Sequence, residues 1–376
     1  MKVVWSTYKF RLYPKKEQEE KLVETLEACR QTYNYFLALW KGGIPSKHEI
    51  SFHLKMLKQE RFEIRKVNFK VLQTTIYRLY SNLRNSKIRK FRFKGRGWFK
   101  TIVYKQGFKL IKTGKRLDVL YVKGVGYIPI RVFRVVNGKI KQIIIKRYNS
   151  GKWFAHICVQ NELCLSKKEP KRVIGIDVGI RYFLVDSEGR FVDNHRFYER
   201  TLERIKIIQH WLSRKKKGSK NYEKQKMKLA KLYERLVGQR NDFLHKLSRF
   251  YVNNYDVICI EDLNIKRMLK NHRLARKILD ASWGKFIRLL EYKAERAGVR
   301  LVKVNPRGTS RGLSYENPLR DCISACRIKM KGWGSPDSPA EMKFCRDSLA
   351  SSVKQEASTN EAAHGSAQSR TGLSAL

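Results

Sequence analysis

The stretch Val173-Ile174-Gly175-Ile176-Asp177-Val178-Gly179 is a short apolar run that carries one carboxylate between two glycines. Its length and composition are typical of a buried strand. A charged carboxylate at the end of such a strand costs stability unless it binds something. The motif alone is not specific, because a strand followed by Asp-x-Gly also opens sugar kinases and actin-like ATPases, and many such aspartates only cap turns. Asp177 is therefore a candidate site residue.

Two further acids occupy comparable places in the sequence. Glu261 ends the apolar run 256–260, and Asp321 follows Pro318, which can start a helix. By itself Asp321 is most simply interpreted as a first-turn helix charge. Hydrolysis of a phosphodiester by in-line attack uses two Mg²⁺ ions about 3.5–4 Å apart, held by carboxylates from separate elements. Together the three acids predict such a centre, with Asp177 bridging the ions and Glu261 and Asp321 each holding one.

The charge of the chain points to a polyanionic partner. The 376 residues include 82 Lys+Arg against 33 Asp+Glu, which gives a formal net charge of +49. Such a charge repels itself in a compact chain, and nucleic acid is its natural counterpart. A membrane partner would call for a basic amphipathic helix, a lipidation signal or an apolar span, and the sequence has none of these. Residues 1–14 lack the apolar centre of a signal peptide, so we expect a cytoplasmic protein of the prokaryotic cytosol or nucleoid.

The cysteines do not form a metal-binding pattern. All seven are scattered, and no Cys-x-x-Cys pair occurs. A structural zinc site needs four tetrahedral ligands, usually supplied by two such pairs. Cys322 and Cys326, four residues apart on an expected helix, are therefore interpreted as core or surface thiols. No zinc is expected.

The order of elements predicts more than one domain, because single cores stop growing near ~250 residues. Residues 3–13 alternate as a strand, helical patterns follow up to residue 94, and short β-branched runs fill 101–165. Hairpin turns are expected at Asn137-Gly138 and at 149–151. Because the first strand has no neighbour in sequence, it must pair later, which predicts a β-barrel interrupted by a helical insertion.

A second domain is expected after the polar linker 165–172. Strands at 173–179 and 182–186, a helical pair over 199–252 hinged at 214–221, a strand at 257–260, a helix at 282–297 and a strand at 299–304 follow in α/β order. From about residue 341 the chain changes to small polar residues. We expect this tail to be disordered.

Several short motifs together resemble one known family over roughly residues 1–330. In order they are Tyr8-Lys9-Phe10-Arg11-Leu12-Tyr13-Pro14, Cys29-Arg30-x-x-Tyr33-Asn34, Gly175-Ile176-Asp177-Val178-Gly179, Arg240-x-Asp242-x-x-His245-Lys246, Ile260-Glu261-Asp262-Leu263, Ser282-Trp283 and Val304-Asn305-Pro306-x-x-Thr309-Ser310. As an ordered set they resemble the transposon-encoded TnpB (OrfB) family of RNA-guided DNA nucleases, which are related to type V CRISPR effectors.

The resemblance implies an α/β plus β-barrel protein. Its parts would be a wedge-type barrel (1–15 and 95–168), an inserted α-helical, helix-turn-helix-like recognition lobe (16–94), an RNase H-like (RuvC) nuclease domain without a zinc ribbon (169–340) and a tail (341–376). It implies an RNA-guided, metal-dependent DNA endonuclease of a transposable element, in which Asp177, Glu261 and Asp321 are the catalytic acids. Implied cofactors are two Mg²⁺ ions, with Mn²⁺ as an alternative, and a guide RNA from the end of the element. The target is double-stranded DNA.

A set of basic and aromatic side chains is predicted to contact nucleic acid, since a guide–target heteroduplex needs a large basic channel. For the cluster at 240–247, a solvated helix face is the simpler interpretation. Aromatic residues such as Trp98 and Phe99 could stack bases, although barrel packing also accounts for them. The predicted contact residues are Lys9, Arg11, Arg30, Tyr33, Lys66, Lys70, Tyr77, Arg78, Arg240, His245, Lys246 and Arg307.

Two departures from the family keep alternatives open. Only residues 311–320 separate Thr309-Ser310 from Asp321, where the family has a zinc ribbon, and Ile323 stands where the family has the Asn of Asp-x-Asn-Ala-Ala. The alternatives are a catalytically weakened or inactive RNA-guided DNA-binding protein, or an accessory transposase protein of the element. A direct strand transferase is disfavoured because the chain contains no His-x-His.

Overall fold

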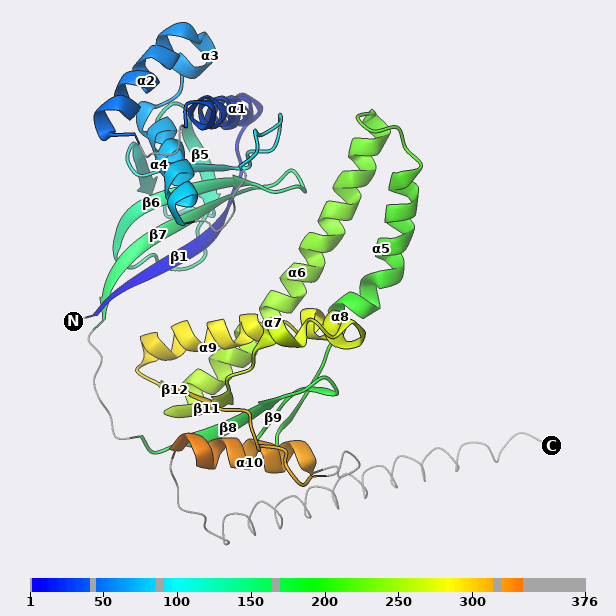
Figure 1. Ribbon diagram of the computed structural model, residues 1–376. Helices are drawn as coiled ribbons and strands as arrows, with labels where there is room; N and C mark the ends of the chain where they lie inside the picture. The colour runs from blue at the N-terminus through cyan, green and yellow to red at the C-terminus, as the bar shows by residue number, and fades with distance from the viewer. Residues whose placement is uncertain (1, 41–44, 86–90, 164–169, 314–318, 334–376) are drawn as a thin grey trace, which may run out of the picture. The chain divides into compact units, whose positions relative to one another are not determined.

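The computed structural model describes residues 2–40, 45–85, 91–163, 170–313 and 319–333. These residues form two compact units, the first made almost entirely of residues up to 164 and the second almost entirely of residues from 165 onward (Figure 1). The predicted tail beyond residue 341 lies outside the described residues. Within the described part of the chain, no helix has both the length and the apolar character needed to cross a membrane.

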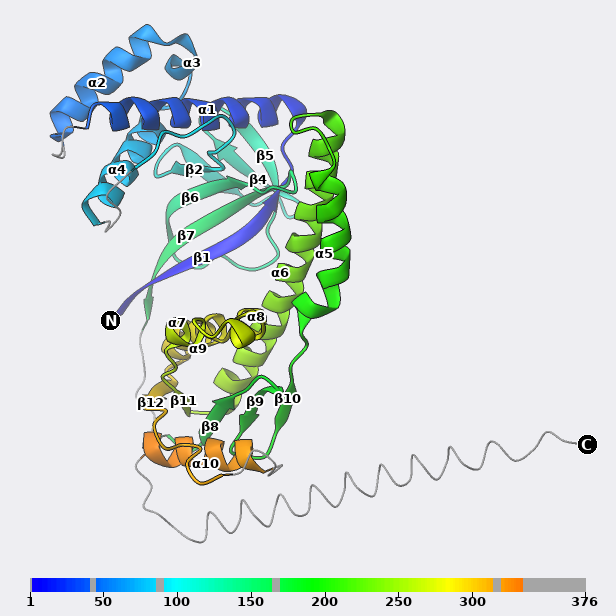
Figure 2. The ribbon, with the colours of Figure 1, turned by 45° about the vertical axis from the view of Figure 1, so that its right-hand side comes forward.

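The first unit is a seven-stranded antiparallel sheet covered by helices, and the sheet curls until it is nearly closed into a barrel (Figure 2). Its strand order is β2-β6-β7-β1-β5-β4-β3. The strands are β1 (Lys2–Leu12), β2 (Thr101–Tyr104), β3 (Phe108–Ile111), β4 (Asp118–Val122), β5 (Gly126–Arg131), β6 (Lys139–Arg147) and β7 (Trp153–Leu163). The helices are α1 (Lys16–Ala38), α2 (Lys47–Glu60), α3 (Phe62–Arg65) and α4 (Phe69–Asn85).

The first strand pairs as the sequence predicts. β1 runs antiparallel to β7 along its whole length, from Lys2 opposite Leu163 to Leu12 opposite Trp153, and its end also pairs with β5. Alternate residues of β1 such as Phe10 and Leu12 are buried in the core that the sheet shares with α1 and α4. The helical segment between β1 and β2 is therefore inserted, in the sequence, between two strands of the same sheet.

Two local predictions in this unit are wrong. Asn137-Gly138 does not form a hairpin, because the strands on either side of it, β5 and β6, are separated in the sheet by β1 and β7. Residues 91–94 are not helical. Asn34 of α1 holds them instead, since its side chain accepts a hydrogen bond from the Lys94 N–H (2.8 Å) and donates one to the Lys94 carbonyl (3.0 Å). Such side-chain pairing of backbone groups replaces the helical bonds.

The second unit is a mixed five-stranded sheet with helices on both faces. The strand order is β10-β9-β8-β11-β12; β8 is parallel to β11 and β11 to β12, whereas β9 is antiparallel to β8. The strands are β8 (Val173–Val178), β9 (Tyr182–Asp186), β10 (Phe191–Asp193), β11 (Val257–Glu261) and β12 (Arg300–Val304). The helices are α5 (Phe197–Ser213), α6 (Lys220–Asn254), α7 (Ile265–Met268), α8 (His272–Ala281), α9 (Trp283–Ala297) and α10 (Arg320–Trp333).

Alternation along β8 and β11 divides the core of this unit in two. Ile174 and Ile176 of β8 and Ile258 and Ile260 of β11 pack with α6 and α9 on one face. The residues between them face α10, which lies across the opposite face of the sheet (Figure 1). Both strands are therefore buried on both sides, as their nearly continuous apolar sequences predict.

Candidate active site

Asp177 and Glu261 lie side by side on the face of the sheet that α10 covers. In the parallel pairing of β8 with β11, Ile176 is opposite Ile260, so the next residues along the two strands are the two acids. Side chains alternate between faces with a period of two. Asp177 therefore shares its face with Gly175, and Glu261 shares its face with Cys259, both of which contact α10.

Two glycines allow α10 to come very close to the sheet. A Cβ atom on Gly175 would overlap the carbonyl oxygen of Ala325 and lie 2.8 Å from the backbone nitrogen of Lys329. A Cβ atom on Gly332 would likewise overlap the side chain of Cys259. Glycine is the residue that permits such backbone approach. This close docking fixes the first turn of α10, which carries Asp321, beside the carboxyl ends of the strands.

Two of the predicted acids, Glu261 and Asp321, act electrostatically on the third, Asp177. Burial, followed by the nearby carboxylates of Glu261 and Asp321, raises the pKa of Asp177 to about 8, while Arg320 opposes the shift. Like charges close together disfavour ionisation in this way. The structure therefore places Asp177 of β8 within electrostatic range of both Glu261 of β11 and Asp321 of α10.

Glu261 is held by a hydroxyl group that the sequence did not identify as a partner. The Thr309 hydroxyl donates a 2.6 Å hydrogen bond to Oε1 of Glu261, whose side chain is only 8% exposed. Burial raises the pKa of Glu261, and the Thr309 hydroxyl and Lys331 oppose that shift. Thr309-Ser310 was visible in the sequence as a motif, but nothing local connects it to an acid 48 residues earlier.

The loop that presents Thr309 is tied to α10. Arg327 donates hydrogen bonds to the carbonyl oxygens of Arg311 (2.7 Å) and Thr309 (3.3 Å). Lys331 donates one to the carbonyl oxygen of Arg307 (2.7 Å). One helix therefore supplies Asp321 and also supports the partner of Glu261.

The chemistry of these side chains suits a hard divalent cation. Three carboxylates offer only oxygen ligands, which Mg²⁺ and Mn²⁺ prefer. A bound cation would also oppose the burial and the repulsion that raise the pKa of Asp177. Within the described residues, however, no three His, Cys, Asp or Glu side chains already stand at the spacing of ligands to one ion. Asp177, Glu261 and Asp321 therefore fit the implied metal in the kind of ligand atom that they offer, and not in spacing.

Cys322 and Cys326 are core residues of the same helix. Both are buried beside Val185, and their thiols point to the carbonyl oxygens of Asp186 (3.8 Å) and Ser187 (3.7 Å). Apolar packing explains their spacing of four on the inner face of α10.

The predicted nucleic-acid residues of the first unit are in two different situations. Lys9 and Arg11 follow the outer face of β1, where the Lys9 ammonium lies 4.2 Å from the centre of the Phe154 ring. Arg30 is instead anchored, because it pairs with both carboxylate oxygens of Glu27 and donates a 2.9 Å bond to the Lys94 carbonyl.

The other predicted residues of this unit lie on the helices. Lys66, Lys70 and Arg78 are exposed, and Tyr77 is half-buried against the core. Tyr33 is buried beside a cavity that Arg78 also lines.

The four predicted residues of the second unit are also divided. Arg240 pairs with the buried carboxylate of Asp280 at 2.5 Å. Asp280 in turn accepts the Tyr198 N–H at the start of α5, so this pair connects helices. Lys246 is exposed and pairs with Asp242 at 2.8 Å. His245 and Arg307 are exposed.

Three family profiles match successive parts of the chain. Residues 1–44 match a helix-turn-helix domain profile (HTH_OrfB_IS605), residues 156–272 match a profile described as a probable transposase (OrfB_IS605), and residues 283–330 match the Cas12f1-like TNB domain. In the structure the described part of the first range holds β1 and α1. The other two ranges contain Asp177, Glu261 and Asp321.

Individual proteins agree with the profiles. InsQ of Escherichia coli K12, named as a candidate RNA-guided DNA endonuclease, is 26% identical over 85% of this chain and 87% of its own length. A Streptomyces pristinaespiralis protein of the same designation is 28% identical over 81% of this chain and 78% of its own. The fold is similar to that of Cas12f1 solved with sgRNA and target DNA, with a TM-score of 0.55 and 12% identity over 87% of this chain and 99% of the other. Over these ranges the chain is thus similar to the OrfB/TnpB family of transposon-encoded proteins.

Proposed function

We propose that this protein is an RNA-guided, metal-dependent DNA endonuclease of a mobile element, and that it cuts DNA with Asp177, Glu261 and Asp321. The observation that carries the proposal is the placement of Asp177 and Glu261 next to each other at the ends of two adjacent parallel strands, with Asp321 near enough to raise the pKa of Asp177. Acids whose pKa is raised by burial and by neighbouring like charges concentrate at functional sites. The names of the relatives support the choice of DNA as substrate and RNA as guide.

The second unit would be the RuvC-type, RNase H-like nuclease domain. Its mixed sheet, with a carboxylate at the end of each of two adjacent parallel strands, supports this assignment. The first unit would combine the wedge-type barrel with the helical recognition lobe. Its exposed cations, among them Lys9, Lys66, Lys70 and Arg78, would bind the guide RNA and target DNA mainly through phosphates.

The acids would bind the catalytic ions, with Asp177 central and Glu261 and Asp321 on either side. When bound, divalent ions supply positive charge for the developing oxyanion and lower the pKa of a water molecule. Thr309 orients the Glu261 carboxylate through the 2.6 Å hydrogen bond. Arg320 and Lys331 place positive charge beside Asp177 and Glu261, where a phosphodiester would also lie.

The test is the substitution Asp177→Ala in the complex of the protein with the RNA that copurifies with it. Cleavage of a matched target DNA should fall below detection while RNA binding stays unchanged, because Asp177 lies in the acid centre and not among the exposed cations. Asp242→Ala is the control, since Asp242 is an exposed acid of the same unit that pairs with Lys246. Cleavage at the wild-type rate by the Asp177→Ala variant would show that Asp177 is not catalytic.

A non-cutting, guide-dependent DNA-binding protein is the second candidate. Ile323 in place of the family's Asn, and the absence of three acids at ligand spacing among the described residues, favour it. A guide-dependent footprint on target DNA without divalent-ion-dependent products would select it.

A further inference from the structure

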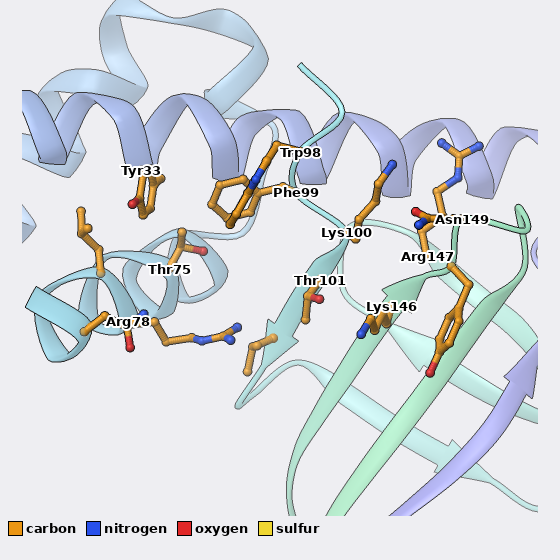
Figure 3. Close-up of a pocket in the computed structure, with 14 residues that line it drawn as sticks. Tyr33, Thr75, Arg78, Trp98, Phe99, Lys100, Thr101, Lys146, Arg147 and Asn149 are labelled. Atoms are coloured by element: carbon orange, nitrogen blue, oxygen red, sulfur yellow. The ribbon is translucent and has the colours of Figure 1, made fainter. Parts of the chain in front are cut away.

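The first unit contains a cavity of about 490 Å³ in which aromatic and basic side chains meet (Figure 3). It lies between α1, α4, the segment before β2 and the turn after β6. Its volume is within the range of small-molecule sites, roughly 300–1,000 Å³. None of its 14 lining residues is acidic. The cavity is therefore large enough for one nucleotide and has the sign of charge that a phosphate requires.

One side of the cavity is a wall of aromatic rings in fixed mutual positions. Tyr33, only 8% exposed, meets the edge of Phe99 with 5.6 Å between ring centres. Phe99 in turn meets the edge of Trp98 at 5.3 Å. Trp98 is nevertheless 57% exposed, and the Lys94 ammonium lies 4.4 Å from its ring centre. The packed rings hold an indole at the mouth of the cavity, where a planar ligand can stack on it.

The other side of the cavity carries cations and amides. Arg78 enters from α4, opposite the aromatic wall, and Lys146 and Arg147 enter from β6 (Figure 3). Arg147 already pairs with Glu19 at 3.1 Å, whereas Arg78 has no carboxylate partner among the described residues. Asn82 and Asn149 add side-chain amides that can both donate and accept hydrogen bonds. The cavity thus offers a stacking surface, positive charge and hydrogen-bonding groups along one lining.

We propose that this cavity binds one unpaired nucleotide of a nucleic-acid strand, with its base on the aromatic wall at Trp98 and its phosphate toward Arg78 and Lys146. A base in a duplex is covered by its neighbours, so the nucleotide must be splayed out of its stack. Stacking on aromatic rings next to cations is how proteins bind single strands without reading a fixed sequence. The inference rests on the proposed function only in taking nucleic acid as the ligand, and it does not depend on cleavage.

The test measures binding of short single-stranded oligonucleotides to the full-length protein, freed of RNA at high salt, by fluorescence anisotropy. Trp98→Ala should weaken binding about tenfold, the usual effect of losing one base–aromatic stack. Trp5→Ala is the matched control, because Trp5 is 59% exposed, lies on β1 of the same unit and is outside the cavity lining. Trp98→Phe keeps a ring and should restore most of the affinity, which separates lost stacking from lost folding.

An oligonucleotide with abasic sites in place of its bases distinguishes stacking from charge. With this probe Trp98→Ala and the wild type should bind equally, while Arg78→Gln should weaken binding to both probes and lower the salt dependence of affinity by about one ion. RNA and DNA versions of the probe identify the strand, and a Trp98-dependent loss with either supports the proposal. Equal losses for Trp98→Ala and Trp5→Ala, or a Trp98 loss that persists on the abasic probe, would overturn it. Because only binding is measured, the outcome is independent of whether Asp177 is catalytic.

Discussion

Burial and neighbouring charges shift the pKa values of His156 in the first unit and Asp177 in the second. The neighbours are cations in the first case and acids in the second, and both shifts favour the neutral form. Burial, Lys9 and Lys146 lower the pKa of His156 to about 4. Burial, Glu261 and Asp321 raise the pKa of Asp177 to about 8. Around His156 the first unit has an exposed Lys9 and a half-buried Lys146, whereas in the second unit Glu261 is buried and Asp177 and Asp321 are half-buried. The proposed function requires such a difference, with nucleic acid bound by the first unit and cations by the second.

Gly175→Ala should have the largest effect on the acid centre without changing any acid. The added Cβ would overlap the Ala325 carbonyl oxygen, so α10 must move away from β8 and take Asp321 with it. We expect a loss of about 1–3 kcal/mol in the free energy of unfolding, typical of overpacking, together with a large loss of cleavage. Urea unfolding and a cleavage assay measure the two effects.

Gly238→Ala is the control for this change. Gly238 lies within α6, and nothing lies within 4 Å of a Cβ built on it. Alanine there should raise stability by up to about 1 kcal/mol. If both glycine variants behaved alike, close docking of α10 would not be what positions Asp321.

The lowered pKa of His156 predicts that the first unit loses stability in acid. The unfolded ring titrates near its usual value of about 6.5, whereas the folded ring stays neutral down to about 4. Between these values the unfolded chain binds more protons, so the free energy of unfolding falls as the pH falls from 6.5 toward 4, by at most about 3 kcal/mol. His156→Gln should remove that part of the loss.

Melting midpoints at pH 7.5 and pH 5 measure the effect, with the exposed His210 of α5 changed to Gln as the control. The wild type and the His210 variant should lose stability in acid by the same amount, and the His156 variant by less. Identical acid sensitivity in all three proteins would show that the cations around β7 do not keep His156 neutral.

Thr309→Val should have a smaller effect, confined to the acid centre. Valine keeps the shape of the side chain but removes the hydroxyl that donates to Glu261. Losing a hydrogen bond to a charged group costs about 1.5–3 kcal/mol, so the cleavage rate should fall tenfold or more. Thr201→Val, which removes a hydroxyl bonded to its own helix at Phe197 (2.7 Å), should leave cleavage unchanged. A Thr309 variant as active as this control would mean that Glu261 needs no such support.

The periodic features of this chain were readable from its sequence, whereas contacts between distant residues were not. Alternation and apolar runs predicted β1, β8 and β11, and with them the positions of Asp177 and Glu261 at strand ends. No local pattern could connect Thr309 with Glu261, or Gly175 with the backbone of α10, because these contacts depend on how helices and loops pack on the sheet. The prediction of a hairpin at Asn137-Gly138 was wrong for a related reason, since a turn sequence does not determine which strands become neighbours.

Binding of Mn²⁺ to the RNA-free protein, followed by electron paramagnetic resonance, tests the central claim most directly. Mn²⁺ can replace Mg²⁺ at oxygen ligands and reports its own binding. We expect bound Mn²⁺ in the wild type and the Asp242→Ala control, weaker binding in Glu261→Gln, and loss of binding in Asp177→Asn. Equal Mn²⁺ binding by all four proteins, or none by any of them, would contradict the assignment of these acids as a metal centre.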